Sequence, residues 1–72
     1  MRYSVTESMC FLEDAGEYKS YGIELSENGC VIERIDDIDI NREEVEALCK
    51  LCNELYVSPI HFRDVVDDYL AK

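Results

Sequence analysis

Two of the four cysteines stand at a spacing that thiol chemistry uses. Cys49 and Cys52 form a C-x-x-C motif, which occurs in thiol redox enzymes and makes half of many zinc sites. Redox pairs are activated at a helix N-terminus, whereas this motif falls in the middle of a predicted helix. We therefore interpret the pair as core residues, because a buried free cysteine packs as a small hydrophobic side chain. The alternative is a zinc or thiol redox site, and zinc would need two further ligands from Cys10, Cys30 and His61.

The single histidine lies near two carboxylates on one predicted helix face. His61 is followed by Asp64 and Asp68 at helical spacing, and a carboxylate can orient an imidazole as a base or as a metal ligand. A polar stripe on an amphipathic helix is, however, ordinarily its solvated face. The sequence also lacks a convincing nucleophile to accompany such a base. We interpret His61 as a surface residue, with metal ligation as the alternative.

A third pattern matches only the start of a calcium loop. Asp37, Asp39 and Asn41 have the spacing of its first three ligands. However, Arg42 stands where the loop needs glycine, and Leu48 stands where it needs a bidentate glutamate. Glycine-rich phosphate loops and dinucleotide fingerprints are also missing from the sequence. We therefore predict that the protein is not an enzyme and that it holds no cofactor or metal.

The first half of the chain has the alternating pattern of β-strands. Gly16 supplies turn chemistry between the first two strands, and Asn28-Gly29 is typical of a tight hairpin turn between the second and the third. The predicted strands cover about residues 2–12, 17–27 and 30–35.

The hairpin turn also predicts a strand register. With two residues in the loop, Glu27 faces Cys30 and Glu24 faces Glu33. Directly opposed like charges are destabilising, so this register needs either a neighbouring cation or a different loop length.

The second half of the chain predicts a helical hairpin at about residues 42–55 and 59–70. Asn41 is the expected N-cap of the first helix, and Ser58 is the expected N-cap of the second, with Pro59 in its first turn. The apolar stripes are Val45, Leu48, Leu51, Cys52 and Leu55, then Phe62, Val65, Val66, Tyr69 and Leu70. We predict one α+β domain over residues 1–72, a three-stranded antiparallel meander packed by a C-terminal helical hairpin.

Charge restricts the classes of partner. Seven basic and 17 acidic residues give a net charge of −10, which disfavours binding to nucleic acid or to an anionic membrane. The longest apolar run, residues 9–12, is far shorter than the roughly 20 residues of a membrane span, and the start lacks a signal-peptide core. We predict a cytoplasmic protein with reduced cysteines.

Acidic residues near the end of the second predicted helix depart from a local rule. The C-terminal end of a helix favours cations, yet Asp67 and Asp68 stand there, with Asp64 and the apolar Ile60 on the same face. This face is a candidate contact for a basic partner. The alternative is an ordinary solubilising surface.

Several short motifs resemble those of a known family. They are Tyr21-Gly22-Ile23, the joint at residues 35–38, Asn53, and the helical segments 58–61 and 64–70. The chain resembles an uncharacterised family of short cytosolic proteins from clostridia and related gut Firmicutes, a domain of unknown function. The resemblance implies a bacterial cytosolic origin, and it brings no activity or functional residue with it.

These observations favour a protein–protein interaction or regulatory module without enzymatic activity. Self-association is its simplest form, through an exposed edge strand or an apolar rim. Tyr3, Phe11 and Tyr18 are candidates for that surface, with core packing as the equal alternative. One alternative is an acidic decoy that occupies a nucleic-acid-binding protein. The other is the zinc or redox protein built on Cys49 and Cys52.

Overall fold

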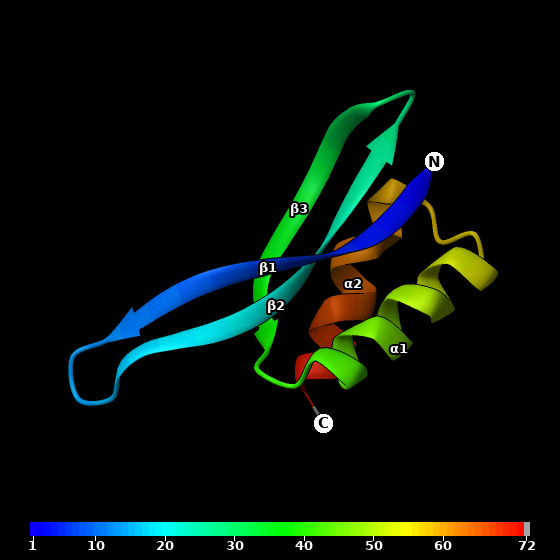
Figure 1. The fold of residues 1–72 in the computed structure, drawn as a ribbon. Helices are drawn as coiled ribbons and strands as arrows, with labels where there is room; N and C mark the ends of the chain where they lie inside the picture. The colour runs from blue at the N-terminus through cyan, green and yellow to red at the C-terminus, as the bar shows by residue number, and fades with distance from the viewer. Residues whose placement is uncertain (72) are drawn as a thin grey trace.

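The computed structural model describes residues 1–71 and shows a three-stranded antiparallel sheet followed by two helices (Figure 1). The strand order is β1-β2-β3, as in a meander. This confirms the α+β fold expected from the sequence. The elements are β1 Arg2–Leu12, β2 Gly16–Glu27, β3 Cys30–Asp39, α1 Arg42–Glu54 and α2 Pro59–Leu70.

The core lies between the two helices and one face of the sheet. Phe62 of α2 is completely buried at its centre, with its ring edge-on to Tyr3 of β1 at a centroid distance of 4.9 Å. Strand and helix side chains interdigitate around this pair, so the helices and the sheet share one apolar cluster. Its buried members are Tyr3, Ile23, Leu25, Ile38, Val45, Leu48, Cys49, Cys52, Phe62 and Val66.

The helix starts follow local chemistry. The N–H of Glu43 donates to Oδ1 of Asn41 over 3.0 Å, which confirms the predicted N-cap of α1. Pro59 occupies the first turn of α2 as predicted, although Ser58, among the described residues, makes no side-chain capping bond. Within residues 1–71, neither helix is long and apolar enough to cross a membrane.

The pairing of β2 with β3 corrects the expected register. Glu27 does face Cys30, but a bulge between Leu25 and Ser26 then shifts the ladder. Glu24 consequently faces Arg34 instead of Glu33, and their charged groups lie 3.9 Å apart. The bulge therefore replaces an unfavourable like-charge pair with an attractive one, which a two-residue turn alone could not reveal.

β3 is longer than the predicted strand at residues 30–35, because it continues through the acidic segment at residues 36–39. Ile35 faces Ile23 and Asp39 faces Tyr21, so three residues of β3 stand opposite Gly22 alone. A Cβ atom on Gly22 would lie 2.3 Å from the carbonyl oxygen of Ile35, so only glycine permits this crossing. We call residues 36–38 the wide bulge, because three residues bulge out here opposite one. At its end, the buried side chain of Ile38 returns to the core.

β1 and β2 extend well beyond the helices as a two-stranded ribbon (Figure 1). Their pairing continues without a shift from Arg2–Ser26 to Leu12–Gly16, whereas β3 pairs with β2 only from Tyr21 onward. We call residues 8–20 the arm. Met9 and Phe11 on the arm are 61% and 70% exposed, because no helix of the same chain covers these apolar side chains.

Candidate functional site

Cys49 and Cys52 are core residues of α1. Both are buried, and burial raises the pKa of each thiol above its ordinary value. A raised pKa disfavours the thiolate, which is the form that acts as nucleophile and metal ligand. Within residues 1–71, the structure places no group of three or more His, Cys, Asp or Glu side chains where they could hold a metal ion. Both cysteines are therefore placed as core residues, with the thiol form favoured.

Thiol labelling of the native protein is expected to divide the four cysteines. Cys30 is exposed and should react rapidly with a small alkylating reagent, and the half-buried Cys10 should react next. Cys49 and Cys52 should react at least about a hundredfold more slowly, because access requires opening of a core worth about 3–5 kcal/mol. Timed mass spectrometry counts the adducts, with urea-unfolded protein as the control. Equally fast labelling of all four thiols would contradict this core.

His61 lies on the surface of α2. Its Nδ1 atom is 3.8 Å from Oδ2 of Asp64, and both side chains are mostly exposed. An exposed pair of this kind orients an imidazole weakly and contributes little energy. The structure thus brings His61 and Asp64 together, but in an arrangement typical of a solvated helix face.

A second polar cluster holds the wide bulge of β3. The Ser20 hydroxyl donates to Oδ1 of Asp37 over 2.6 Å, and Tyr18 donates to Oδ2 of the same carboxylate over 3.2 Å. Asp37 has a positive φ of 55°, so these bonds stabilise a strained backbone position. Ser20 is completely buried and cannot meet a substrate. We assign this cluster to the fold.

The bulge is also tied to α2. The Tyr69 hydroxyl donates to Oδ2 of Asp39 over 2.5 Å, and the N–H of Asn41 donates to Oδ1 of Asp39. These bonds, the one from Tyr69 foremost, hold the pKa of Asp39 below its ordinary value, and the same contact raises the pKa of Tyr69 to about 12. Tyr69 is thereby fixed at the outer junction of the two helices.

The solvent side of the helical hairpin carries an apolar band, which we call the helical seam. A shallow groove there is lined by Glu44, Ala47, Leu48 and Leu51 of α1 and by Tyr69 of α2. Helical spacing extends this lining by one turn on each helix. The helical seam comprises Ala47, Leu48, Leu51, Leu55, Val65 and Tyr69.

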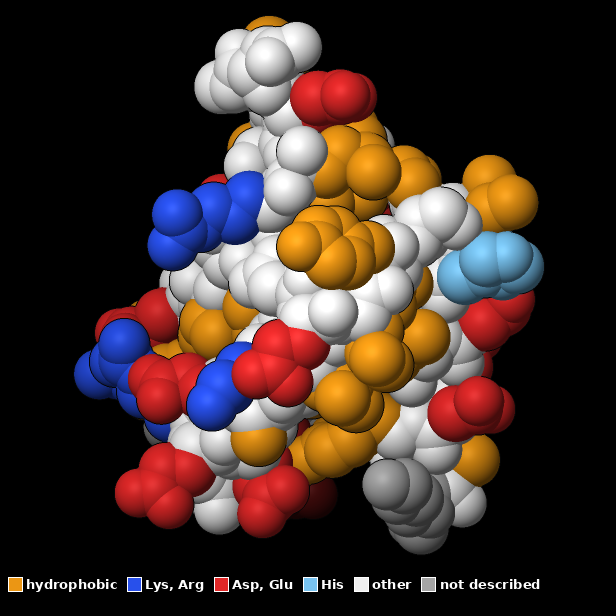
Figure 2. Space-filling view, turned by 90° about the vertical axis from the view of Figure 1, so that its right-hand side faces the viewer, with side chains coloured by type: hydrophobic (Ala, Val, Ile, Leu, Met, Phe, Trp, Pro, Cys, Tyr) orange, Lys and Arg blue, Asp and Glu red, His pale blue; other side chains and the backbone are white. Residues whose placement is uncertain are grey.

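Much of the helical seam is open to solvent. Leu51 is 46% and Leu55 is 64% exposed, although both were predicted as core positions. The prediction was wrong for these two, because the buried side of α1 is rotated toward Cys49. It was also wrong for Leu70, which is exposed at the end of α2. Figure 2 shows the resulting hydrophobic band on the molecular surface, running between charged side chains.

Acidic residues border the helical seam. Asp64 and Asp68 form a stripe of α2 directly beside Val65 and Tyr69, and Glu44 lines the groove from α1. Figure 2 shows acidic groups on both sides of the band. The other two predicted contact residues, Ile60 and Asp67, are exposed on the next stripe of α2. The structure thus places half of the predicted contact set at an apolar surface that sequence reasoning had assigned to the core.

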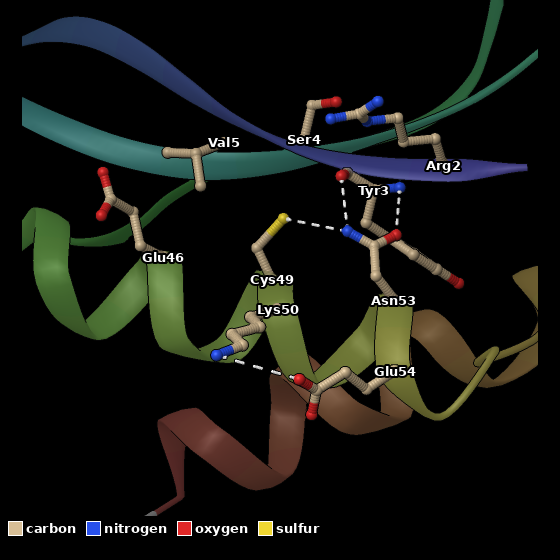
Figure 3. Close-up of a pocket in the computed structure, with 9 residues that line it drawn as sticks. All are labelled: Arg2, Tyr3, Ser4, Val5, Glu46, Cys49, Lys50, Asn53 and Glu54. Atoms are coloured by element: carbon tan, nitrogen blue, oxygen red, sulfur yellow. Dashed lines mark hydrogen bonds and ion pairs between the residues drawn. The ribbon is translucent and has the colours of Figure 1, made fainter.

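A separate groove lies between β1 and α1, and we call it the β1 groove (Figure 3). At its end, the N–H of Tyr3 donates to Oδ1 of Asn53 over 2.9 Å, and Nδ2 of Asn53 donates to the carbonyl oxygen of Tyr3 over 3.0 Å. One amide side chain therefore satisfies both backbone groups of a strand residue. The lining residues are Arg2, Tyr3, Ser4, Val5, Glu46, Cys49, Lys50, Asn53 and Glu54.

Comparison with known families gives a match over the whole chain. The model of a "Family of unknown function (DUF6514)" covers residues 1–72. The protein belongs to this family. The resemblance to an uncharacterised family, indicated by the hairpin and helix motifs, is thus confirmed at that level. No curated protein and no solved structure matches the chain.

DUF6514 is a family of unknown function, and the surface of this member is the guide to what it binds. The helical seam is the feature that most needs an explanation. Exposed contiguous apolar surface with a polar rim is typical of interaction sites. The sequence held one signal for it, because the apolar positions of α1 together with Cys49 span a wider arc than a single helix–sheet contact can bury.

Proposed function

We propose that this DUF6514 protein is a non-enzymatic interaction module whose helical seam binds a basic amphipathic helix of a partner protein. The observation that carries the proposal is the exposure of Leu51 and Leu55 in an apolar band with acidic borders. We place this module in a bacterial cytoplasm, in line with four free cysteines.

The chemistry of the surface argues for that class of partner. A groove between two helices receives an amphipathic helix through apolar anchors spaced three and four residues apart. Asp64, Asp68 and Glu44 would then face the Lys and Arg residues that flank such anchors. Attraction between the acidic borders and a basic helix accelerates their encounter, and the same borders repel acidic helices. The apolar anchors supply most of the affinity.

A synthetic helix tests the proposal directly. A peptide with leucines at helical spacing and lysines elsewhere should bind, as measured by fluorescence anisotropy. The double variant L51S/L55S should weaken binding roughly tenfold or more, because two leucine contacts lose their apolar burial. Both residues are exposed, so the fold should persist, and circular dichroism of the variant checks this.

Two controls separate the helical seam from bulk charge. A scrambled peptide of the same composition carries the same charge without an apolar face, and it should bind much more weakly. The matched variant I32S removes an exposed apolar side chain of β3, outside the helical seam, and should leave binding unchanged. Equal affinity of the seam variant and the wild-type protein for the amphipathic peptide would overturn the proposal.

A further inference from the structure

The outer edge of β1 is open over most of its length. β1 pairs with β2 on one side, and no strand within residues 1–71 pairs with the other. Natural edge strands are usually protected by proline, lysine, a bulge or a covering element. Residues 4–12 contain no proline or lysine and a single charge, Glu7. This edge is therefore a template for another strand.

The contact with Asn53 shows which backbone groups face outward. Both the N–H and the carbonyl of Tyr3 bond to the Asn53 side chain, so they point away from β2. Because alternate residues of a strand present their backbone to the same side, Val5, Glu7 and Met9 also present theirs at the open edge. Asn53 takes the place of a neighbouring strand at Tyr3, and an added strand must stop there.

We propose that two copies of the chain pair antiparallel through β1 to form a continuous six-stranded sheet centred on Ser8. The free stretch, residues 4–12, is symmetrical about Ser8, so this register uses all of it. Val5 then lies opposite the partner's Phe11, and Glu7 lies opposite the partner's Met9. A two-fold axis at Glu7 would instead place the two Glu7 carboxylates directly opposite each other, which is destabilising.

The arm and the β1 groove are complementary in this arrangement. Side chains of Tyr3 and Val5 point to the helix-covered face, so Met9 and Phe11 of the arm point to the same face. In the antiparallel pair, each arm runs beside the start of the partner's β1. The exposed Phe11 then reaches the partner's β1 groove, a space of ≈ 400 Å³ between β1 and α1. Each copy supplies one arm and one groove, as a two-fold interface requires.

A second, independent observation lies at the proposed axis. Among the described residues, the hydroxyls of Thr6 and Ser8 are buried without a hydrogen-bond partner, and that of Ser8 lies at the axis. In the dimer Ser8 faces the partner's Ser8 as a non-hydrogen-bonded pair of the antiparallel ladder, with Cα atoms about 4.5 Å apart. Rotation of each Ser8 side chain about χ1 would bring the two hydroxyls within hydrogen-bonding distance of each other. This inference rests on residues outside the helical seam, so its failure and the failure of the proposed function are separate results.

Sedimentation equilibrium of the full chain tests the association. The protein should be dimeric at about 100 µM, and the dimer should tighten as salt rises from about 0.15 M to about 1 M, because two copies of charge −10 repel each other. F11S should raise the dimer Kd roughly tenfold or more, and the matched variant I32S should leave it unchanged. A monomer at every concentration would overturn the proposal.

A cross-link tests the register. With Cys10 and Cys30 changed to serine, S8C should form an intermolecular disulfide under mild oxidation, because facing residues of such a pair have the separation that a disulfide needs. S26C in the same background, on the central strand, should stay monomeric on a non-reducing gel. A dimer that lacks the S8C cross-link, or one that is lost in L51S/L55S and kept in F11S, would overturn the edge interface.

Discussion

Replacing Phe62 with alanine is expected to leave most of the protein unfolded at 25 °C. The side chain is completely buried against Tyr3 and joins α2 to the sheet. Truncation of a buried phenylalanine costs about 3–5 kcal/mol, because the transfer energy is lost and a cavity remains. A single core of this size supplies about the same net stability. Urea unfolding followed by circular dichroism should therefore show little or no native baseline for F62A.

The arm offers a matched control for F62A. Phe11 is 70% exposed, so F11A removes the same atoms without creating an internal cavity. Measured at a concentration at which the chain is monomeric, F11A should change the free energy of unfolding by about 0.5 kcal/mol or less. An F62A protein as stable as F11A would contradict the core described above.

Replacing Gly22 with alanine is expected to have the second largest effect. The new Cβ would lie 2.3 Å from the Ile35 carbonyl oxygen and 2.8 Å from Cα of Asp36, and both of these are backbone atoms. Relief requires β3 to move away from β2, with a cost of about 3 kcal/mol. Urea unfolding measures this loss. Amide chemical shifts of residues 36–39 should show that the wide bulge has moved.

Gly16 provides the control for that substitution. It has a positive φ of 78°, and a Cβ there would meet open space among the described residues. G16A should therefore cost only the backbone strain, about 1 kcal/mol. If G22A proved no more destabilising than G16A, the close approach of β3 to β2 would be wrong.

The two proposed interfaces respond to salt in opposite directions. Binding of a basic helix at the helical seam is weakened by salt, because attraction between opposite charges is screened. Pairing of two copies through β1 is strengthened by salt, because repulsion between acidic copies is screened. A salt titration of the wild-type protein therefore distinguishes the two events before any variant is made.

Local chemistry made much of the fold predictable. Asn28 and Gly29 both take positive φ in the turn between β2 and β3, and Asn41 caps α1, because such preferences act over a few residues. The end of β3 was not predictable in this way. Asp36 to Asp39 have the composition of a loop, and they pair as a strand only because Gly22 admits the chain beside β2.

The candidate site was only partly predictable for a related reason. Burial of Cys52 followed from the helical pattern, and so did the acidic face with Asp64 and Asp68, whereas Cys49 lay outside the predicted apolar stripe. Leu51 was assigned to the core because helical spacing reports which residues share a face and does not report which face meets the sheet. The rotation of α1 about its axis decides that, and it depends on packing against Tyr3 and Phe62.

By itself, the amino-acid sequence determined the three strands, the two helices, their turns and caps, the acidic charge and the apolar character of the core, because each depends on near neighbours or on composition. The tertiary structure alone decided the register after the bulge at Leu25, the wide bulge opposite Gly22, the exposure of the helical seam and the open edge of β1. These features depend on contacts between residues far apart in the chain, whose geometry no local preference encodes.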